Sequence, residues 1–269
     1  MFPTPIQNYS LKVNVAYRLL LILTLLVWLL PLIAVMLTSI RTFEDVLAGN
    51  YWTFPEETAL ISNYSKVFEN GKMGRFFLNS LIITLPTVFG TLFLSSLAGY
   101  SLAMHRFKLN LLVFAMFIAG NFVPFQILMI PVRNISIEMG MYNTHLGLII
   151  FHIAFQTGFC TFFLRNFIKE LPFELIEAAR ADGATEWTIY RKIILPLVIP
   201  ALAALGVLEF TFIWNDYFWA LVLTQGDSVK PITVGLDVLR GQWTTSWNLV
   251  SAGSVVAALP PVIMFFILQ

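Results

Sequence analysis

Charged side chains are scarce in this chain. Asp, Glu, Lys and Arg make up 12% of its 269 residues, whereas hydrophobic residues make up 58%. Soluble domains carry roughly 25% charged residues. A chain with half that share belongs to the membrane class on composition alone. The net charge of +1 gives no indication of a nucleic-acid partner, and we expect none.

Cysteine and histidine are scarce as well. Cys160 is the single cysteine, which excludes an internal disulfide and a thiolate metal cluster. His105, His145 and His152 do not lie at metal-ligand spacings. We expect His105 to be solvated and His145 to cap or pack. The sequence also lacks a Gly-rich phosphate loop, so we expect neither a metal nor a cofactor in this chain, and no ATP bound by the chain itself.

Long stretches without charge divide the chain into membrane spans, because a charge at mid-bilayer costs several kcal/mol. Each stretch supplies the ~20 apolar residues that a helix needs to cross. The first stretch is too long for a signal peptide and is interpreted as a permanent span. The sequence predicts an all-α integral membrane fold with one domain over 1–269. Its six spans are predicted near residues 17–38, 76–103, 109–131, 145–164, 197–223 and 248–268.

Six spans place both termini on the same side of the membrane. That side carries nine of the 16 basic residues in short loops, while the opposite side carries seven, in longer loops with eight acids. Because cytoplasmic loops are enriched in Lys and Arg, this bias predicts cytoplasmic termini. The chain stops at Gln269 without the basic residues that normally follow a last cytoplasm-facing span, which leaves open whether it is complete there.

A polar stretch, residues 171–196, separates the fourth and fifth spans. Its pattern predicts a helix over 173–182, then Gly183 where a left-handed C-cap is needed, then a second helix over 184–195. Two adjacent alanines in the first helix allow close approach of another surface. The alternative is an ordinary amphipathic helix that lies on the lipid headgroups.

The residues of this stretch follow a fixed pattern: Glu-Ala-Ala, three residues, Gly, nine residues, Ile, one residue, Leu-Pro. The pattern resembles the EAA signature of binding-protein-dependent ABC importer permeases. The positions that match are Glu177, Ala178, Ala179, Gly183, Ile193, Leu195 and Pro196. Residues 77–81, 143–148 and 214–216 resemble the maltose-type carbohydrate subgroup. Across nearly the whole chain, the resemblance is to the shorter, six-span partner of such a permease pair, with a type I importer fold.

The resemblance implies a transport subunit of an ATP-driven sugar importer in the bacterial inner membrane. It implies a coupling helix that docks on a cytoplasmic ATPase, with contacts from Glu177, Ala178, Ala179, Asp182 and Gly183. It also implies a second permease subunit in a heterodimer, two copies of the ABC ATPase that bind ATP and Mg, and a soluble or lipid-anchored substrate-binding protein.

The fifth span is unusual because it contains acids. Glu209 and Asp216 are seven residues apart and would share one face of a continuous helix. Intramembrane acids usually face a bundle interior or a watery cavity. Aromatic rings beside Asn and Asp offer a sugar stacking faces and hydrogen bonds. The residues predicted to line a substrate pathway are Asn121, Gln126, Glu209, Trp214, Asn215, Asp216 and Tyr217.

Each of these assignments has an alternative. Trp214 and Trp219 can belong to an interfacial aromatic belt, and Glu209 can be a structural partner for a polar group on another helix. The subunit can also line the path without binding sugar, since in some maltose-type pairs the longer partner makes most contacts. In the third span, Pro124 and Pro131 predict a kink, which suits either a moving gate or a fixed bend.

Two other functions remain alternatives to an importer subunit. An integral-membrane enzyme would need a clustered catalytic set near one interface, which the sequence does not show. An ion- or proton-coupled carrier could use Glu209 and Asp216, but such carriers typically have more spans, built as repeats. The sequence does not name the sugar, because a separate binding protein would set most of the specificity.

Overall fold

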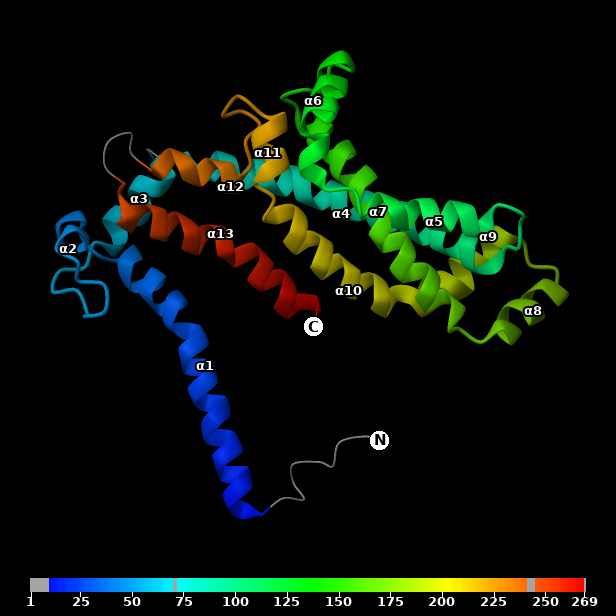
Figure 1. Ribbon diagram of the computed structural model, residues 1–269, viewed down its shortest axis with the longest axis horizontal. Coiled ribbons are helices and arrows are strands. Elements are labelled where there is room, and N and C mark those ends of the chain that lie inside the picture. Colours follow the sequence, from blue (N-terminus) through cyan, green and yellow to red (C-terminus); the bar gives the residue numbers. More distant parts are fainter. Residues whose placement is uncertain (1–9, 70–71, 241–244, 269) are drawn as a thin grey trace. The chain divides into compact units, whose positions relative to one another are not determined.

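The computed structural model describes residues 10–69, 72–240 and 245–268, and these residues are predominantly helical (Figure 1). Within this part of the chain the only β structure is an isolated bridge between Arg240 and Thr245. The chain divides into two compact units. The first unit comprises the described residues of 1–71 and 239–256, and the second comprises those of 72–238 and 257–269.

Five helical segments of the described chain are long and apolar enough to cross a membrane, and a bent pair raises the number to six. The predicted all-α membrane fold is confirmed. The long helices are α1 (Leu11–Ser39), α4 (Met73–Met104), α7 (His145–Lys169), α10 (Leu195–Trp214) and α13 (Trp247–Leu268). The bent pair joins α5 (Asn110–Gly120) to the 3₁₀ turn η2 (Phe125–Leu128) and α6 (Met129–Glu138). Shorter elements are α2 (Phe43–Leu47), α3 (Leu60–Glu69), α12 (Ile232–Gly235) and η4 (Leu236–Leu239).

The third predicted span is broken rather than gently kinked. The helix axis turns by 87° between the two members of the bent pair. Pro124 lies at the break: it lacks a backbone N–H and disfavours a helical conformation for Val123. Pro131 lies in the first turn of α6 and causes no second break. A bend at Pro124 is thus confirmed, and whether it moves as a gate stays a prediction.

The fifth predicted span also ends early. The helix α10 stops at Trp214, and a new short helix, α11 (Phe218–Leu223), follows a non-helical turn. The expectation that Glu209 and Asp216 share one helical face is therefore wrong. The physical reason is that the Asp216 carboxylate accepts hydrogen bonds from the first turn of α11, which starts a second helix in place of another turn of α10.

The core of the second unit is built on α4, which buries a row of small polar side chains. Thr87 Oγ1 donates to Ile83 O, one turn earlier in the same helix (2.6 Å). Ser95 Oγ donates to Thr157 O on the neighbouring helix α7 (3.3 Å). In a bilayer the hydrophobic effect does not drive helices together, because lipid tails are as apolar as the side chains. Small residues let the helices approach closely and associate through packing contacts instead. Toward the start of α4, Asn79 Nδ2 donates to Lys230 O (2.9 Å), just before α12, and Ser80 Oγ accepts from Ile232 N (2.8 Å), at the first residue of α12.

The first unit has its own buried polar centre. Arg41 is fully buried and donates to the Asp45 carboxylate and to Thr53 O. Asn63 donates to Ser39 O (2.9 Å) and Arg41 O (2.8 Å). These bonds satisfy backbone carbonyls where the long helix α1 ends, and so hold the loop that follows it.

Packing between α7 and α5 depends on the absence of a side chain at Gly158. A Cβ added there would lie 2.7 Å from Phe117 O on α5 and 3.0 Å from Asn121 Nδ2. Because one neighbour is backbone, we expect Gly158→Ala to lower the free energy of unfolding by about 1–3 kcal/mol. The measurement is thermal unfolding in lipid nanodiscs.

The matched control is Gly206→Ala in α10. Gly206 is also buried and helical, but a Cβ there meets only Leu92 Cδ1, at an ordinary 3.6 Å. We expect the melting temperature of this variant to be unchanged or higher, since Ala is a better helix former than Gly by about 1 kcal/mol. Equal melting temperatures for the two variants would contradict the packing argument.

Candidate functional site

Residues 171–196 form the helix–glycine–helix elbow that their pattern predicts. The helix α8 (Phe173–Ala181) ends before Gly183, whose φ of +79° is the left-handed conformation of a C-cap. The next helix, α9 (Glu186–Ile189), is capped by Thr185 and leads through a π-helical turn, η3 (Tyr190–Ile194), into α10. A π turn inserts an extra residue and often marks a functional position.

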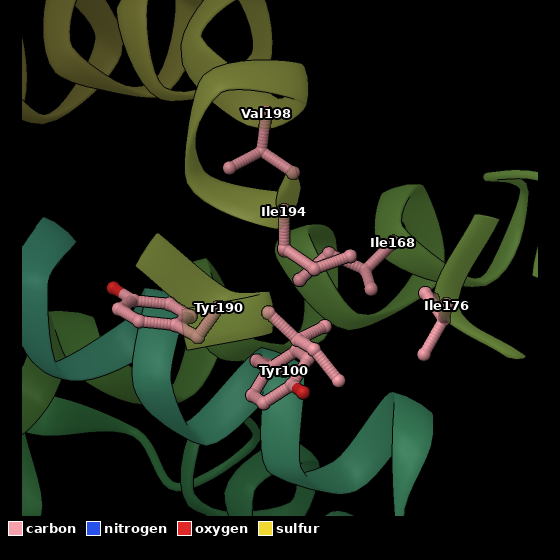
Figure 2. Close-up of a cluster of buried hydrophobic side chains, with 7 residues drawn as sticks. Tyr100, Ile168, Ile176, Tyr190, Ile194 and Val198 are labelled. Carbon is pink, nitrogen blue, oxygen red and sulfur yellow. The ribbon is translucent and has the colours of Figure 1, made fainter. Parts of the chain in front are cut away.

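A buried side chain of α8 packs against the rest of the second unit. Ile176 is 1% exposed and belongs to a cluster of buried side chains contributed by α4, α7, α9, η3 and α10 (Figure 2). The cluster consists of Tyr100, Ile168, Ile176, Ile189, Tyr190, Ile194 and Val198. On α8 itself, Glu177 and Ala178 are exposed. The helix therefore packs through one face and presents the Glu-Ala pair to its surroundings.

Arg180 in the last turn of α8 is bonded across the elbow. Its Nε donates to Glu186 Oε1 at 2.9 Å. This hydrogen bond raises the pKa of Arg180, so the guanidinium stays charged. Of the five predicted coupling residues, Ala179 is half-buried, whereas Glu177, Ala178, Asp182 and Gly183 are exposed and available to a partner.

A second feature of this unit is a hollow of about 400 Å³ beside the turn between α10 and α11. Four of the predicted pathway residues line it: Asn121, Asn215, Asp216 and Tyr217. They come from two parts of the sequence, the break after α5 and the turn after α10. Gln126, Glu209 and Trp214 are not among its lining residues. Two interruptions of helical spans thus meet at one place.

The Asp216 carboxylate already has partners. Its oxygens accept from Trp219 N (3.3 Å) and Ala220 N (2.9 Å), and His152 Nε2 lies 3.6 Å away. The backbone oxygen of Asp216 accepts from Thr233 Oγ1 (2.6 Å). Asp216 therefore holds the turn and the start of α11. Its neighbour Asn215 also lines the hollow and is more exposed than Asp216, and its Nδ2 donates to Thr211 O at 2.9 Å.

Glu209 and Trp214 lie in packed surroundings. Glu209 is 0% exposed, and its Oε1 accepts from Cys160 Sγ at 3.2 Å. Within the described residues its Oε2 has no hydrogen-bond partner. Trp214 donates to Ala257 O (2.8 Å) and stacks on Phe210. For Glu209 the alternative of a structural partner matches this geometry better than a substrate contact does. Trp214 is 1% exposed, which matches neither a substrate contact nor a place in an interfacial aromatic belt.

Two polar residues that line the hollow were not among the pathway residues predicted from the sequence. His152 and Gln156 of α7 both line it, together with the aromatic ring of Phe155. They are four residues apart, so they share one face of the helix. A polar pair in a span is rare and is itself a signal of an interior or watery cavity, which could have led to them.

Each of the other two histidines contacts one polar side chain from a distant part of the sequence. His145 Nε2 lies 3.0 Å from Asn79 Oδ1 in the packed interior, as expected for a packing role. His105 is 40% exposed and lies 3.3 Å from Glu186 Oε2. A search of the described residues for three or more His, Cys, Asp or Glu that could hold a metal ion found none.

An elbow at a span boundary and a hollow beside interrupted helices are compatible with a membrane transport permease. Residues 92–269 match the family described as "Binding-protein-dependent transport system inner membrane component", and the chain belongs to that family. It is therefore a transport component, a multi-pass permease of an ABC importer in the inner membrane. The family that the EAA pattern predicted is confirmed.

Several characterised proteins are similar over most of their length. The chain is 34% identical over 239 residues to the lactose transport system permease protein LacG of Rhizobium radiobacter, covering 89% of this chain and 86% of that protein. The identity is 33% over 241 residues to the melibiose/raffinose/stachyose import permease protein MelC of Bacillus subtilis, with 89% and 86% covered. It is 35% over 249 residues to the osmoprotective compounds uptake permease protein GgtD of Synechocystis sp., with 90% and 84% covered.

Solved structures show the same fold. A permease chain of a bacterial ABC transporter that imports the acidic polysaccharide alginate superposes with a TM-score of 0.84 at 23% identity, covering 97% of this chain and 98% of that one. A chain of the bacterial alginate ABC transporter in complex with an alginate pentasaccharide-bound periplasmic protein gives 0.69 at 18% identity, covering 94% and 92%. Together they confirm the importer permease fold.

The geometry of Asp216 leads to a prediction that distinguishes two contributions of its side chain, the capping hydrogen bonds and the negative charge. Asp216→Ala removes two acceptors at the start of α11, so we expect the free energy of unfolding to fall by about 1 kcal/mol. Asp216→Ser keeps a capping oxygen without the charge and is expected to retain the wild-type melting temperature. Thermal unfolding in nanodiscs compares the two. A wild-type melting temperature for Asp216→Ala would show that the carboxylate does not support the turn.

Proposed function

We propose that this permease carries a sugar or sugar derivative inward, and that residues 171–196 dock on a separate cytoplasmic ATPase. The observation that carries the docking is the exposed Glu177–Ala178 surface of α8, held by the buried Ile176 at its back. A helix anchored in this way is in direct contact with the spans behind it. Support for the cargo comes from relatives whose names specify lactose and melibiose, raffinose or stachyose.

The partners follow from the docking. A second permease subunit completes a heterodimer, two copies of an ABC ATPase bind ATP and Mg, and a soluble or lipid-anchored protein delivers the sugar. This chain contributes no cofactor of its own. Both termini and residues 171–196 lie in the cytoplasm, in keeping with the distribution of Lys and Arg.

The hollow beside α10 and α11 is the proposed substrate path. Trp219, Phe155 and Tyr217 supply ring faces on which the C–H groups of a sugar can stack, and Asn215 and Gln156 supply amides for its hydroxyls. Its volume of about 400 Å³ lies in the range of small-molecule sites. An ion-coupled carrier is less favoured, since Asp216 is bonded within its turn and Glu209 does not line the hollow.

Uptake by the assembled transporter tests this proposal. The chain is co-expressed with its neighbouring genes and reconstituted in liposomes, and the uptake of radiolabelled lactose and raffinose is measured with ATP inside. We expect uptake of at least one of these sugars with the intact ATPase and none with a hydrolysis-deficient ATPase. Undiminished uptake with the deficient ATPase would exclude an ATP-driven importer.

The turn at Gly183 gives a second prediction. A β-branched residue pays about 1–2 kcal/mol in the left-handed conformation, so we expect Gly183→Val to lower uptake per ATP hydrolysed about tenfold while the complex still reaches the membrane. Among the described residues no atom lies within 4 Å of an added Cβ, so the effect comes from the backbone and not from a clash.

The matched control is Gly183→Asn, because Asn tolerates the left-handed conformation. We expect this variant to keep most of the coupling. Both variants are measured for sugar uptake and ATP hydrolysis in the same liposomes. Equal coupling in the Val variant and the wild type would mean that the turn conformation is not needed.

A further inference from the structure

Gly183 forms the left-handed turn that ends α8, and an added Cβ there would meet only open space in the described chain. Backbone hydrogen bonds from Gly183 N to Arg180 O and from Ala184 N to Ala179 O close the turn, each at 3.0 Å. Behind it, α8 packs through the apolar side chains of Ile176 and Ala179. A side-chain contact that crosses the turn and reaches α4 would add a polar connection of defined geometry to this packing.

One carboxylate crosses the turn. Glu186 lies three residues after Gly183 and Arg180 lies three residues before it. Glu186 Oε1 accepts from Arg180 Nε at 2.9 Å, and its Oε2 accepts from Tyr100 Oη at 2.6 Å. His105 Nε2 lies 3.3 Å from the same Oε2. We call Arg180, Glu186, Tyr100 and His105 the Glu186 bridge.

The far end of the bridge is fixed in α4. Tyr100 is 5% exposed and belongs to the buried cluster that Figure 2 shows, where its ring lies among Ile194, Ile168 and Tyr190. One turn earlier on α4, Ser96 Oγ lies 2.7 Å from Tyr190 Oη, a second polar contact between α4 and the chain that follows Gly183. The end of α8 is thus connected through Glu186 to a buried residue of α4.

We propose that Glu186 is a positioning residue that holds α8 at a set angle to α4, so that a push on α8 reaches α4 in place of being absorbed at Gly183. The proposal rests on the docking of α8 to an ATPase described above. Glu186 touches neither nucleotide nor sugar. It acts through Arg180 on one side of the turn and Tyr100 on the other.

The contribution of the bridge is moderate, because Glu186 and Arg180 are 46% and 34% exposed. Exposed ion pairs are weak, but the hydroxyl of the buried Tyr100 is held in one place and gives the bridge a defined geometry. Coupling between sites typically spans 5- to 150-fold, so we expect removal of the bridge to lower uptake per ATP about fivefold, at the low end of that range.

The first experiment measures the angle of α8 without any partner or substrate. Spin labels are placed on the exposed positions Glu174→Cys in α8 and Ser101→Cys in α4, with Cys160→Ser, in the full chain in nanodiscs. We expect Glu186→Gln and Tyr100→Phe to broaden the distribution of distances between the labels. The control Glu170→Gln removes an exposed acid outside the bridge and is expected to leave the distribution unchanged.

The second experiment uses the assembled transporter with labelled lactose or raffinose, whichever the wild type carries. Glu186→Gln and Tyr100→Phe are expected to lower uptake per ATP hydrolysed with ATPase subunits still bound. The double variant is expected to lose little more than either single variant, since both act on one bridge. A charge exchange, Arg180→Glu with Glu186→Arg, is expected to restore part of the coupling.

The outcomes are distinct. Wild-type distance distributions in both single variants, or the same broadening in Glu170→Gln, would overturn the proposal whatever the transporter carries. If Glu186→Gln fails to assemble, Tyr100→Phe decides, because it removes a single hydroxyl. A wild type without ATP-driven sugar uptake contradicts the proposed function, whereas the distances between labels still decide on the bridge.

Discussion

The backbone of this chain has no water to bond with over most of its length, and this constraint governs the rest of the structure. Inside a bilayer each N–H and C=O must be satisfied within the protein, so the apolar stretches become helices. A helix can stop at bilayer depth only where side chains or other backbone groups take over its orphan donors and acceptors. The turn after α10 is such a place, and Asn215 and Asp216 of this turn line the hollow together with Asn121 from the break after α5.

The turn between α10 and α11 illustrates the rule. The sequence marks Asp216 as an acid at an unusual depth in the membrane. The structure gives this carboxylate a structural role there, because its oxygens accept hydrogen bonds from N–H groups in the first turn of α11. The same turn leaves the Asn215 side chain exposed in the hollow. Asp216, which secures the turn, and Asn215, which is exposed in the hollow beside it, are thus neighbours in the sequence with different surroundings.

The elbow near Gly183 follows the same logic at a span boundary. The glycine ends α8, Thr185 caps the next helix, and Ile176 inserts into the cluster behind. The motif residues Glu177 and Ala178 are exposed, which fits residues whose partner is another protein. The Glu186 bridge gives this exposed helix a polar connection to α4 in addition to its apolar anchor.

Much of this could be predicted from the sequence, because spans and caps are local. Scarcity of charge marks the membrane class, and Gly183 in its pattern marks both a left-handed turn and a family. The break at Pro124 is also local in origin, although its 87° angle is not. By contrast, the expectation that α10 continues through Asp216 was wrong. Hydrophobic periodicity predicts a continuous helix, but the Asp216 side chain caps α11 and so favours the start of a new helix.

The sequence by itself thus determined the class of protein, the family and the location of the elbow, since composition, run length and short motifs act over a few residues. Tertiary structure alone decided which polar groups meet. It brings His152 and Gln156 of α7 to the hollow, turns Glu209 toward Cys160, and joins Tyr100 to Glu186 across 86 residues. Such meetings depend on how helices pack, and packing is set by contacts between distant segments that no local pattern encodes.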